Sequence, residues 1–398
     1  MARAMAKKGK APAASPAAAP AGEARFRNLL AGDPAPMFKQ RSATNPRFVF
    51  DTVGGRYILL AFIGSTSEPM GAAAAKAFES LVPMFDPARL IGFTVSADPR
   101  DEAEERLKPN QPRTNVFWDF DLAVAREYGA AAMDPEAGGG AYRPLWFLLD
   151  PTLRILAVFG PPTDEAKLAQ IRGFLQNLPA PERHGGFPYH APVLYIPRVF
   201  EPSLCKALIE HYERTGGEES GFMRDVNGRT TTVYDPAHKR RRDAQIDDLD
   251  LMQRARERVR RRIVPEIKKA FQFDVTRVER DIVACYRAED DAHFRAHRDN
   301  TTMGTAHRRF AVSINLNSEF EGGLLSFPEF SPVGYKPAPG GAVVFSCSLL
   351  HAASPVTKGH RYAYLPFLYD DAAAKVRAQN NSFLDPNVGE YQLAAAGG

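Results

Sequence analysis

The first half of the chain contains apolar runs that do not alternate with polar residues. Such runs are typical of strands buried on both faces of a sheet, and they occur at residues 56–64, 90–98, 145–150 and 155–160. Helix-favouring segments lie between or after them, at 71–85, 121–129 and 164–178. Asp150 and Pro151 are a turn signal that would join the last two strands as a hairpin. The pattern predicts an α/β domain over residues 25–180.

The second half of the chain has a different order of elements. Pro and Gly are frequent around 181–190, where we expect a linker. Helical segments follow at 202–215 and 248–273, and then come short strands, at 282–288, 310–317, 324–330, 341–348 and 361–370. Helices followed by many short strands predict a double-stranded β-helix, or jelly-roll, with flanking helices over 191–372. Residues 373–398 would form a C-terminal tail, and the fold class is a two-domain combination of α/β and α+β.

Composition and charge indicate the class of protein and the compartment to expect. The chain has 398 residues, 44% of them hydrophobic, and a net charge of +4, which is ordinary for a globular protein. Three cysteines are too few for a disulfide framework and fit a reducing compartment, so we expect the cytoplasm. Residues 1–24 are rich in Ala, Pro and Lys, lack the apolar core of a secretory signal, and predict a disordered leader.

Two classes of partner are not expected. No apolar run approaches the roughly 18 residues of a membrane span. The arginine run at 254–262 lies on an amphipathic helix, and without interleaved aromatic residues it is more typical of a solvated face than of a nucleic-acid site. We therefore expect neither a membrane nor a nucleic acid as partner.

The segment "HFRAHRDN" at 293–300 contains a candidate metal motif. On a helix, His293 and His297 would share a face, as in the zinc-protease motif, but Phe294 stands where that motif has its Glu. On a strand, His297 and Asp299 point the same way. They would supply two ligands of a site in which two histidines and one carboxylate bind iron.

The third ligand has a candidate further along the chain. His351 follows a strong predicted strand, and Arg361 comes ten residues later, on the next strand. Three protein ligands on one face of an iron ion leave three positions open, of which a 2-oxo acid can take two and dioxygen one. The far carboxylate of the oxo acid needs a fixed cation, and the planar guanidinium of Arg361 suits it better than a lysine would.

These motifs resemble the prolyl-4-hydroxylase type of the Fe(II)/2-oxoglutarate dioxygenases. The resemblance covers about 190–370 and includes "CYRAEDDAHFRAHRDN", "RRFAVSINLNSEFEGGLLSF" and "PAPGGAVVFSCSLLHAASPVTKGHR". It implies Fe(II), 2-oxoglutarate and O2, and it adds ascorbate to the candidate cofactors. It also implies that Tyr286 contacts the far carboxylate of 2-oxoglutarate, and that Asn315 stands where some relatives have a cofactor-binding Tyr. The activity implied is hydroxylation of an aliphatic C–H, with a prolyl residue of a peptide or protein as the best choice and release of succinate and CO2.

The first half resembles the peroxiredoxin family and its thioredoxin-like fold over about 25–178. The opening "LLAGDPAPMF" and Thr66 in "FIGSTSEPMGAAAA" carry the resemblance. That family has a cysteine three residues after this threonine, but all cysteines of the chain follow residue 200. Because a peroxidase of this kind needs a thiolate, we expect a redox-inactive domain that serves docking, substrate presentation or formation of a homodimer.

Two other functions stay open from the sequence. The substrate of the hydroxylase could be a free amino acid or another small metabolite. A non-catalytic sensor or interaction protein that binds iron is the other alternative, although a complete ligand set argues against it.

Overall fold

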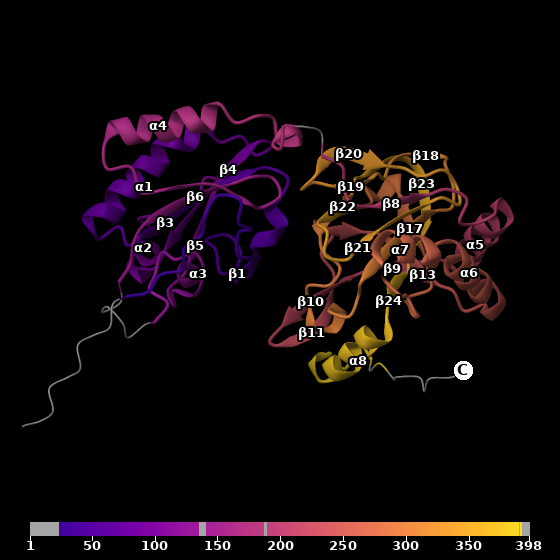
Figure 1. Ribbon diagram of the computed structural model, residues 1–398. Coiled ribbons are helices and arrows are strands. Elements are labelled where there is room, and N and C mark those ends of the chain that lie inside the picture. The colour runs from indigo at the N-terminus through magenta and orange to yellow at the C-terminus, as the bar shows by residue number, and fades with distance from the viewer. Residues whose placement is uncertain (1–23, 135–140, 187–188, 390, 392–398) are drawn as a thin grey trace, which may run out of the picture.

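The computed structural model describes residues 24–134, 141–186, 189–389 and 391. It shows two domains side by side, each built around its own sheets (Figure 1). The predicted leader at 1–24 lies almost wholly outside the described residues. No helix in the described part of the chain is both long enough and apolar enough to cross a membrane.

The N-terminal domain is a five-stranded sheet with helices on both faces. Its strand order is β5-β4-β3-β6-β7. Strand β4 runs parallel to both β3 and β5, and β6 runs antiparallel to β3. A separate two-stranded hairpin, β1–β2, precedes the sheet. The strands are β1 (Lys39–Gln40), β2 (Phe48–Val49), β3 (Tyr57–Gly64), β4 (Leu90–Ser96), β5 (Thr114–Trp118), β6 (Leu145–Leu149) and β7 (Ile155–Phe159). The helices are η1 (Phe50–Val53), α1 (Pro69–Leu81), η2 (Val82–Met84), α2 (Pro99–Ala103), α3 (Ala123–Glu127), α4 (Glu165–Gln176) and η4 (Pro181–Arg183).

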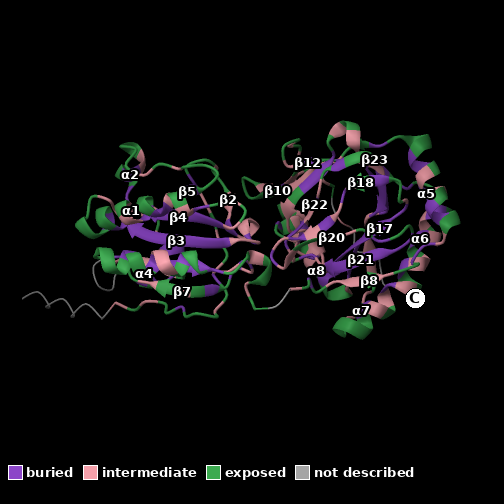
Figure 2. Ribbon diagram, turned by 90° about the horizontal axis from the view of Figure 1, so that it is seen from above, coloured by how far each residue is buried: buried purple, intermediate pink, exposed green. Residues whose placement is uncertain are grey.

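Burial on both faces explains why apolar and polar residues do not alternate along the central strand β3. Ile58, Leu60 and Phe62 pack into the core on the α3 side, and the residues between them pack against α1 and α4. The whole of β3 is therefore buried, as Figure 2 shows. The predicted strands, helices and hairpin are confirmed, but the sequence analysis missed β5 and α2, which are only five residues long each.

The C-terminal domain folds as two facing sheets with helices packed outside. The larger sheet has the path β14-β24-β17-β23-β15-β13-β9, to which β21, β8 and β18 add, and the smaller has the order β12-β16-β22-β19-β20. The first strands are β8 (Leu194–Ile196), β9 (Glu218–Glu219), β10 (Phe222–Val226), β11 (Arg229–Val233), β12 (Lys239–Arg240), β13 (Arg242–Gln245), β14 (Arg277–Glu279), β15 (Ile282–Arg287) and β16 (His293–His297). The others are β17 (Phe310–Asn315), β18 (Phe320–Gly322), β19 (Leu325–Phe327), β20 (Ser331–Tyr335), β21 (Ala342–Ser346), β22 (His351–Ala353), β23 (Val356–Tyr364) and β24 (Phe367–Tyr369).

The helices of this domain cover the larger sheet and its end. They are α5 (Pro202–Thr215), α6 (Leu249–Arg262), α7 (Val264–Phe271), η5 (Ala288–Asp290), η6 (Met303–Thr305), α8 (Asp371–Gln379) and η7 (Asn380–Phe383). The single helix predicted at 248–273 is in fact two, because Pro265 in the first turn of α7 has no N–H to continue the helical ladder. The segment expected as a tail contains most of α8.

Strand β17 shows how the fold aims polar groups at the interior. Phe310, Val312 and Ile314 pack into the core beneath the helices. The alternate residues therefore face the space between the two sheets, where Ser313 and Asn315 are buried. The alternation seen in the sequence thus separates a structural face from a face that points into the barrel.

Candidate metal centre

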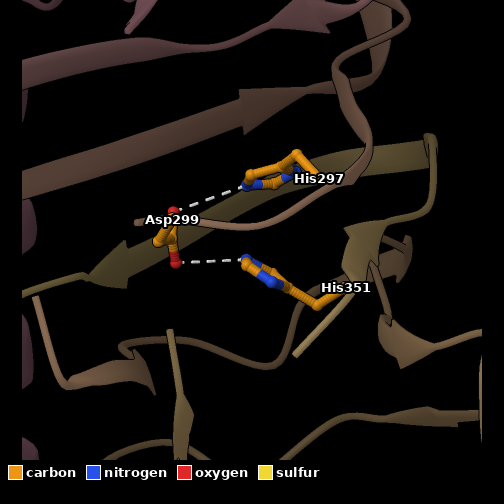
Figure 3. A group of neighbouring side chains, drawn as sticks. All are labelled: His297, Asp299 and His351. Atoms are coloured by element: carbon orange, nitrogen blue, oxygen red, sulfur yellow. Dashed lines mark ion pairs between the residues drawn. The ribbon is translucent and has the colours of Figure 1, made fainter. Parts of the chain in front are cut away.

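Three predicted ligand side chains meet where strands β16 and β22 run side by side. His297 ends β16, Asp299 follows two residues later, and His351 opens β22. The antiparallel register pairs the two histidines, whose ring centroids are 4.2 Å apart. Each Nε2 faces the carboxylate of Asp299, at 3.6 Å from His297 and 3.3 Å from His351 (Figure 3). One donor atom of each residue lies within 4.8 Å of the others, so a single metal ion could bind all three.

Backbone carbonyls fix the orientation of both imidazole rings. Nδ1 of His297 lies 2.7 Å from the carbonyl oxygen of Arg295, and Nδ1 of His351 lies 3.0 Å from that of Leu349. A carbonyl oxygen only accepts, so the hydrogen bonds assign the ring proton to Nδ1 and leave the Nε2 lone pairs for a metal. His293, the competing histidine, is turned away and bonds the carbonyl of Asp291 at 2.7 Å.

The electrostatics keep these residues in the states that bind a cation. Burial lowers the pKa of His297 to about 4, and the neighbouring His351 acts in the same direction. Burial disfavours ionisation of Asp299, but the adjacent His351 and His297 outweigh it and lower the pKa of that carboxyl below its usual range. At neutral pH, His297 is therefore neutral and Asp299 is ionised, as metal ligation requires.

A small chamber of about 60 Å³ lies behind the three side chains and contains Arg361. This arginine is only 3% exposed. Its Nε donates to Oδ1 of Asn315 at 3.1 Å and its Nη2 donates to Oγ of Ser313 at 2.8 Å. No carboxylate of the described residues forms an ion pair with it, and burial lowers its pKa. Because a buried cation without a counter-ion is costly, the chamber favours a ligand with a carboxylate.

Tyr286 and Asn315, the two finer predictions, both lie beside Arg361. Tyr286 is its register partner on β15, and its ring centroid is 5.3 Å from the guanidinium carbon. The Tyr286 hydroxyl accepts a hydrogen bond of 3.3 Å from Arg241, which is paired with Asp243. Asn315 has its oxygen on Arg361 and its nitrogen on a backbone carbonyl at 3.0 Å. Its amide thus orients Arg361, and Tyr286 lines the chamber.

A larger cavity of about 760 Å³ opens on the other side of the triad. His297, Asp299, Phe294 and Arg280 line both cavities, whereas His351 lines the inner chamber alone, so His297 and Asp299 lie at the junction of the two cavities. Residues of the β1–β2 hairpin and of the hairpin β10–β11 also line the larger cavity. The site therefore has an inner chamber beside a buried cation and an outer cavity to which both domains contribute.

The sequence analysis missed the outer walls of this site. The turn of hairpin β10–β11 is Asn227-Gly228, both with positive φ, and this dipeptide is the strongest short signal for a hairpin. That signal could have located the hairpin. No comparable pattern marks β1 and β2, which are two residues each.

Two family models match separate parts of the chain. Residues 282–369 match the model of the 2OG-Fe(II) oxygenase superfamily, and residues 31–158 match that of the AhpC/TSA family. The chain joins a 2OG-Fe(II) oxygenase domain to an AhpC/TSA domain. The first of these families uses Fe(II), 2-oxoglutarate and O2, and the protein is a dioxygenase that depends on them.

Solved structures resemble the two domains separately. A prolyl hydroxylase from Trichoplax adhaerens, in complex with a hypoxia inducible factor peptide fragment, is 18% identical, with 55% of this chain and 97% of that chain covered and a TM-score of 0.39. A Pseudomonas putida prolyl-4-hydroxylase is 18% identical, with 45% of this chain and 92% of that chain covered and a TM-score of 0.33. Xanthomonas campestris peroxiredoxin Q is 17% identical, with 35% of this chain and 89% of that chain covered and a TM-score of 0.29. A search of curated proteins finds no match.

The AhpC/TSA domain contacts the oxygenase domain directly behind the triad. Arg298 lies between two triad residues in sequence, and its Nη2 donates to Glu329 at 2.8 Å. The same guanidinium reaches the AhpC/TSA domain, where its Nε is 3.3 Å from the Asp51 carboxylate. Glu329 also accepts the N–H of Leu350 at 3.3 Å, next to His351. One largely buried ion cluster thus links the AhpC/TSA domain to both segments that carry the triad.

The AhpC/TSA domain has no thiol at the expected position. Thr66 donates a hydrogen bond to Asp101, and the residue three positions later is Pro69, the first residue of α1. The three cysteines of the chain are all buried in the oxygenase domain, where burial raises the pKa of Cys205 to about 11 and that of Cys285 to about 12. None of these environments activates a thiolate, so a cysteine peroxidase is disfavoured.

Proposed function

We propose that His297, Asp299 and His351 bind Fe(II), and that Arg361 binds the far carboxylate of 2-oxoglutarate in the inner chamber. The single observation that carries this proposal is the convergence of the three donor atoms beside the inner chamber that Arg361 lines. Both Nε2 atoms and the carboxylate of Asp299 converge there, and the buried guanidinium of Arg361 lies behind them, with no carboxylate partner among the residues that the structure describes.

The reaction proposed is hydroxylation of an aliphatic C–H, with a prolyl residue of a peptide or protein as substrate. Bound Fe(II) would let one O2 convert 2-oxoglutarate to succinate and CO2 and place its second oxygen atom in the C–H bond. Ser313 and Asn315 hold the guanidinium of Arg361, and the backbone carbonyls hold both histidine rings. The chain's part is to leave metal positions open, fix the co-substrate and confine the substrate to the outer cavity.

Turnover of 2-oxoglutarate to succinate tests this proposal, measured with Fe(II), O2 and a panel of proline-containing peptides. His297→Ala should remove both iron binding and succinate formation. Arg361→Gln should keep iron binding but raise the KM for 2-oxoglutarate by about 10–100-fold, because a buried charge-assisted pair is lost.

A matched control is His360→Ala. His360 is adjacent to Arg361 in sequence, but its side chain is 41% exposed and pairs with Glu289. This variant should keep wild-type succinate formation. Equal succinate formation by His297→Ala and His360→Ala would contradict the ligand assignment, and turnover with free proline but with no peptide would replace the polypeptide substrate by a small one.

A further inference from the structure

The outer cavity has an excess of positive charge. Eight Lys and Arg side chains line it, against four Asp and Glu side chains. Three of the four carboxylates are already engaged, since Asp299 belongs to the triad, Asp51 pairs with Arg298, and Glu279 pairs with Arg308 at 2.8 Å. The charge of the cavity is therefore not balanced by its own walls.

Three exposed cations at this cavity have no carboxylate partner among the described residues. The Nζ of Lys39 donates to the carbonyl of Thr301 at 3.0 Å, and Arg47 donates to a backbone carbonyl of hairpin β10–β11. The guanidinium of Arg224 lies 5.4 Å from the ring centroid of Phe222 and makes no hydrogen bond to a described residue. Each keeps N–H donors free for a ligand.

Two of these cations belong to the AhpC/TSA domain. Lys39 is paired with Val49 across the β1–β2 hairpin, and both residues line the cavity. The hairpin is held against the oxygenase domain by Lys39 itself, by Arg47 and by the cluster of Asp51 with Arg298. The AhpC/TSA domain therefore forms one wall of the cavity that His297 and Asp299 line.

We propose that the β1–β2 hairpin of the AhpC/TSA domain is part of the substrate site, and that the substrate is a polypeptide segment with acidic side chains beside the oxidised residue. This inference rests on the proposed function and names the substrate class. Lys39 and Arg47 on one wall and Arg224 on the other would pair with those side chains and keep the segment over the triad.

The size of the cavity and the placement of the cations favour a polypeptide over a small anion. A volume of about 760 Å³ lies in the upper part of the range of about 300–1,000 Å³ for ligand sites. A single amino acid would leave most of it empty. The cations come from two hairpins on two different domains, and a segment with several acidic side chains could pair with all three at once.

Peptide binding tests the inference without turnover. The full-length protein, loaded with Mn(II) and 2-oxoglutarate, is titrated into three fluorescein-labelled peptides of equal length. Each has a central proline, flanked by Glu, Gln or Lys, and fluorescence anisotropy reports the Kd. Because Mn(II) replaces Fe(II), the result does not depend on whether the peptides are oxidised, and the succinate assay tests the proposed function separately.

The Glu-flanked peptide should bind at least tenfold more tightly than the Lys-flanked one, and added salt should weaken its binding. Lys39→Gln and Arg224→Gln should each weaken binding by about threefold, and the double variant by about tenfold, which matches exposed ion pairs. Arg260→Gln, an exposed arginine of α6 outside this cavity, should leave the Kd unchanged.

Three results would overturn the inference. One is equal binding, or no binding, of the three peptides. Another is loss of affinity in Lys39→Gln and Arg224→Gln no greater than in Arg260→Gln. The third is displacement of the Glu-flanked peptide by free glutamate at a similar Kd, which would assign the site to small anions.

Discussion

Replacing Glu329 by Gln tests whether the ion cluster behind the triad supports the metal site. Glu329 is 6% exposed, and its carboxylate accepts two hydrogen bonds from Arg298, at 2.8 and 3.2 Å. It accepts a third hydrogen bond from the N–H of Leu350, at 3.3 Å. The change removes one of two negative charges that face the buried guanidinium, and Asp51 remains as the other.

The magnitude follows from this arrangement. Removing one partner of a buried ion pair costs about 3–5 kcal/mol when the remaining charge is left alone. Because Asp51 still faces Arg298, we expect Glu329→Gln to lower the free energy of unfolding by about 2–3 kcal/mol. Residues that orient metal ligands change metal affinity by about 10–100-fold, and since Glu329 acts through neighbours of the ligands we expect about tenfold.

Urea denaturation of the metal-free protein gives the first quantity, and calorimetric titration with Mn(II) gives the second. The matched control is Glu321→Gln, since Glu321 is 66% exposed and its ion pair with Lys358 spans two strands at the surface. That control should change stability by less than about 0.5 kcal/mol. If Glu329→Gln and Glu321→Gln gave the same stability and the same Mn(II) affinity, the cluster would have no role in holding the ligands.

Three further results are expected. Mn(II) at about 100 times its Kd should stabilise the protein by about 2.7 kcal/mol in thermal or urea unfolding, and His351→Ala should abolish this gain; stabilisation that persists in this variant would refute the assignment of His351. Burial lowers the pKa of His238 to about 4, against about 6.5 in the unfolded chain, so stability is lost as pH falls from 6.5 towards 4. His238→Phe, which keeps the ring against Phe294, should lose less stability between pH 7 and pH 5 in urea, and an equal loss would contradict the shift. Gly55 has φ +93° and an added Cβ would lie 2.7 Å from Pro328, so Gly55→Ala should destabilise the protein by about 1–3 kcal/mol, whereas unchanged unfolding would show that this contact between the domains can yield.

The pair His297 and Asp299 could be predicted from the sequence because a local rule governs it, whereas the prediction of His351 and Arg361 rests on their place on later strands and on the family resemblance. A strand places alternate residues on one face, so the spacing of His297 and Asp299 carries information by itself. Asn315 and Ser313 follow the same alternation on β17. Each of these two pairs depends on the alternation of side chains along one extended segment.

The cluster of Asp51, Arg298 and Glu329 could not be predicted in this way. In sequence, Arg298 is a spacer between two ligands, and its partners lie 247 and 31 residues away. Nothing in the local pattern of any of the three residues indicates the others. The interface between the domains, and with it the outer cavity, is therefore a property of the tertiary structure alone.

The position of this interface within the AhpC/TSA domain explains how the domain can serve the oxygenase without a thiol. Gly54 and Gly55 pack against the oxygenase domain just before β3 begins, whereas Thr66 and Pro69 follow the other end of that strand. The eight residues of β3 rise by about 3.3 Å each, which separates the two ends by about 25 Å. A cysteine at position 69 would thus lie beyond the far end of β3 from the interface, and the surface that contacts the oxygenase domain lies at the opposite end of that strand. The absence of a cysteine at position 69 leaves that surface unaffected, and the substrate wall that we propose would depend on the β1–β2 hairpin, Asp51 and the two glycines.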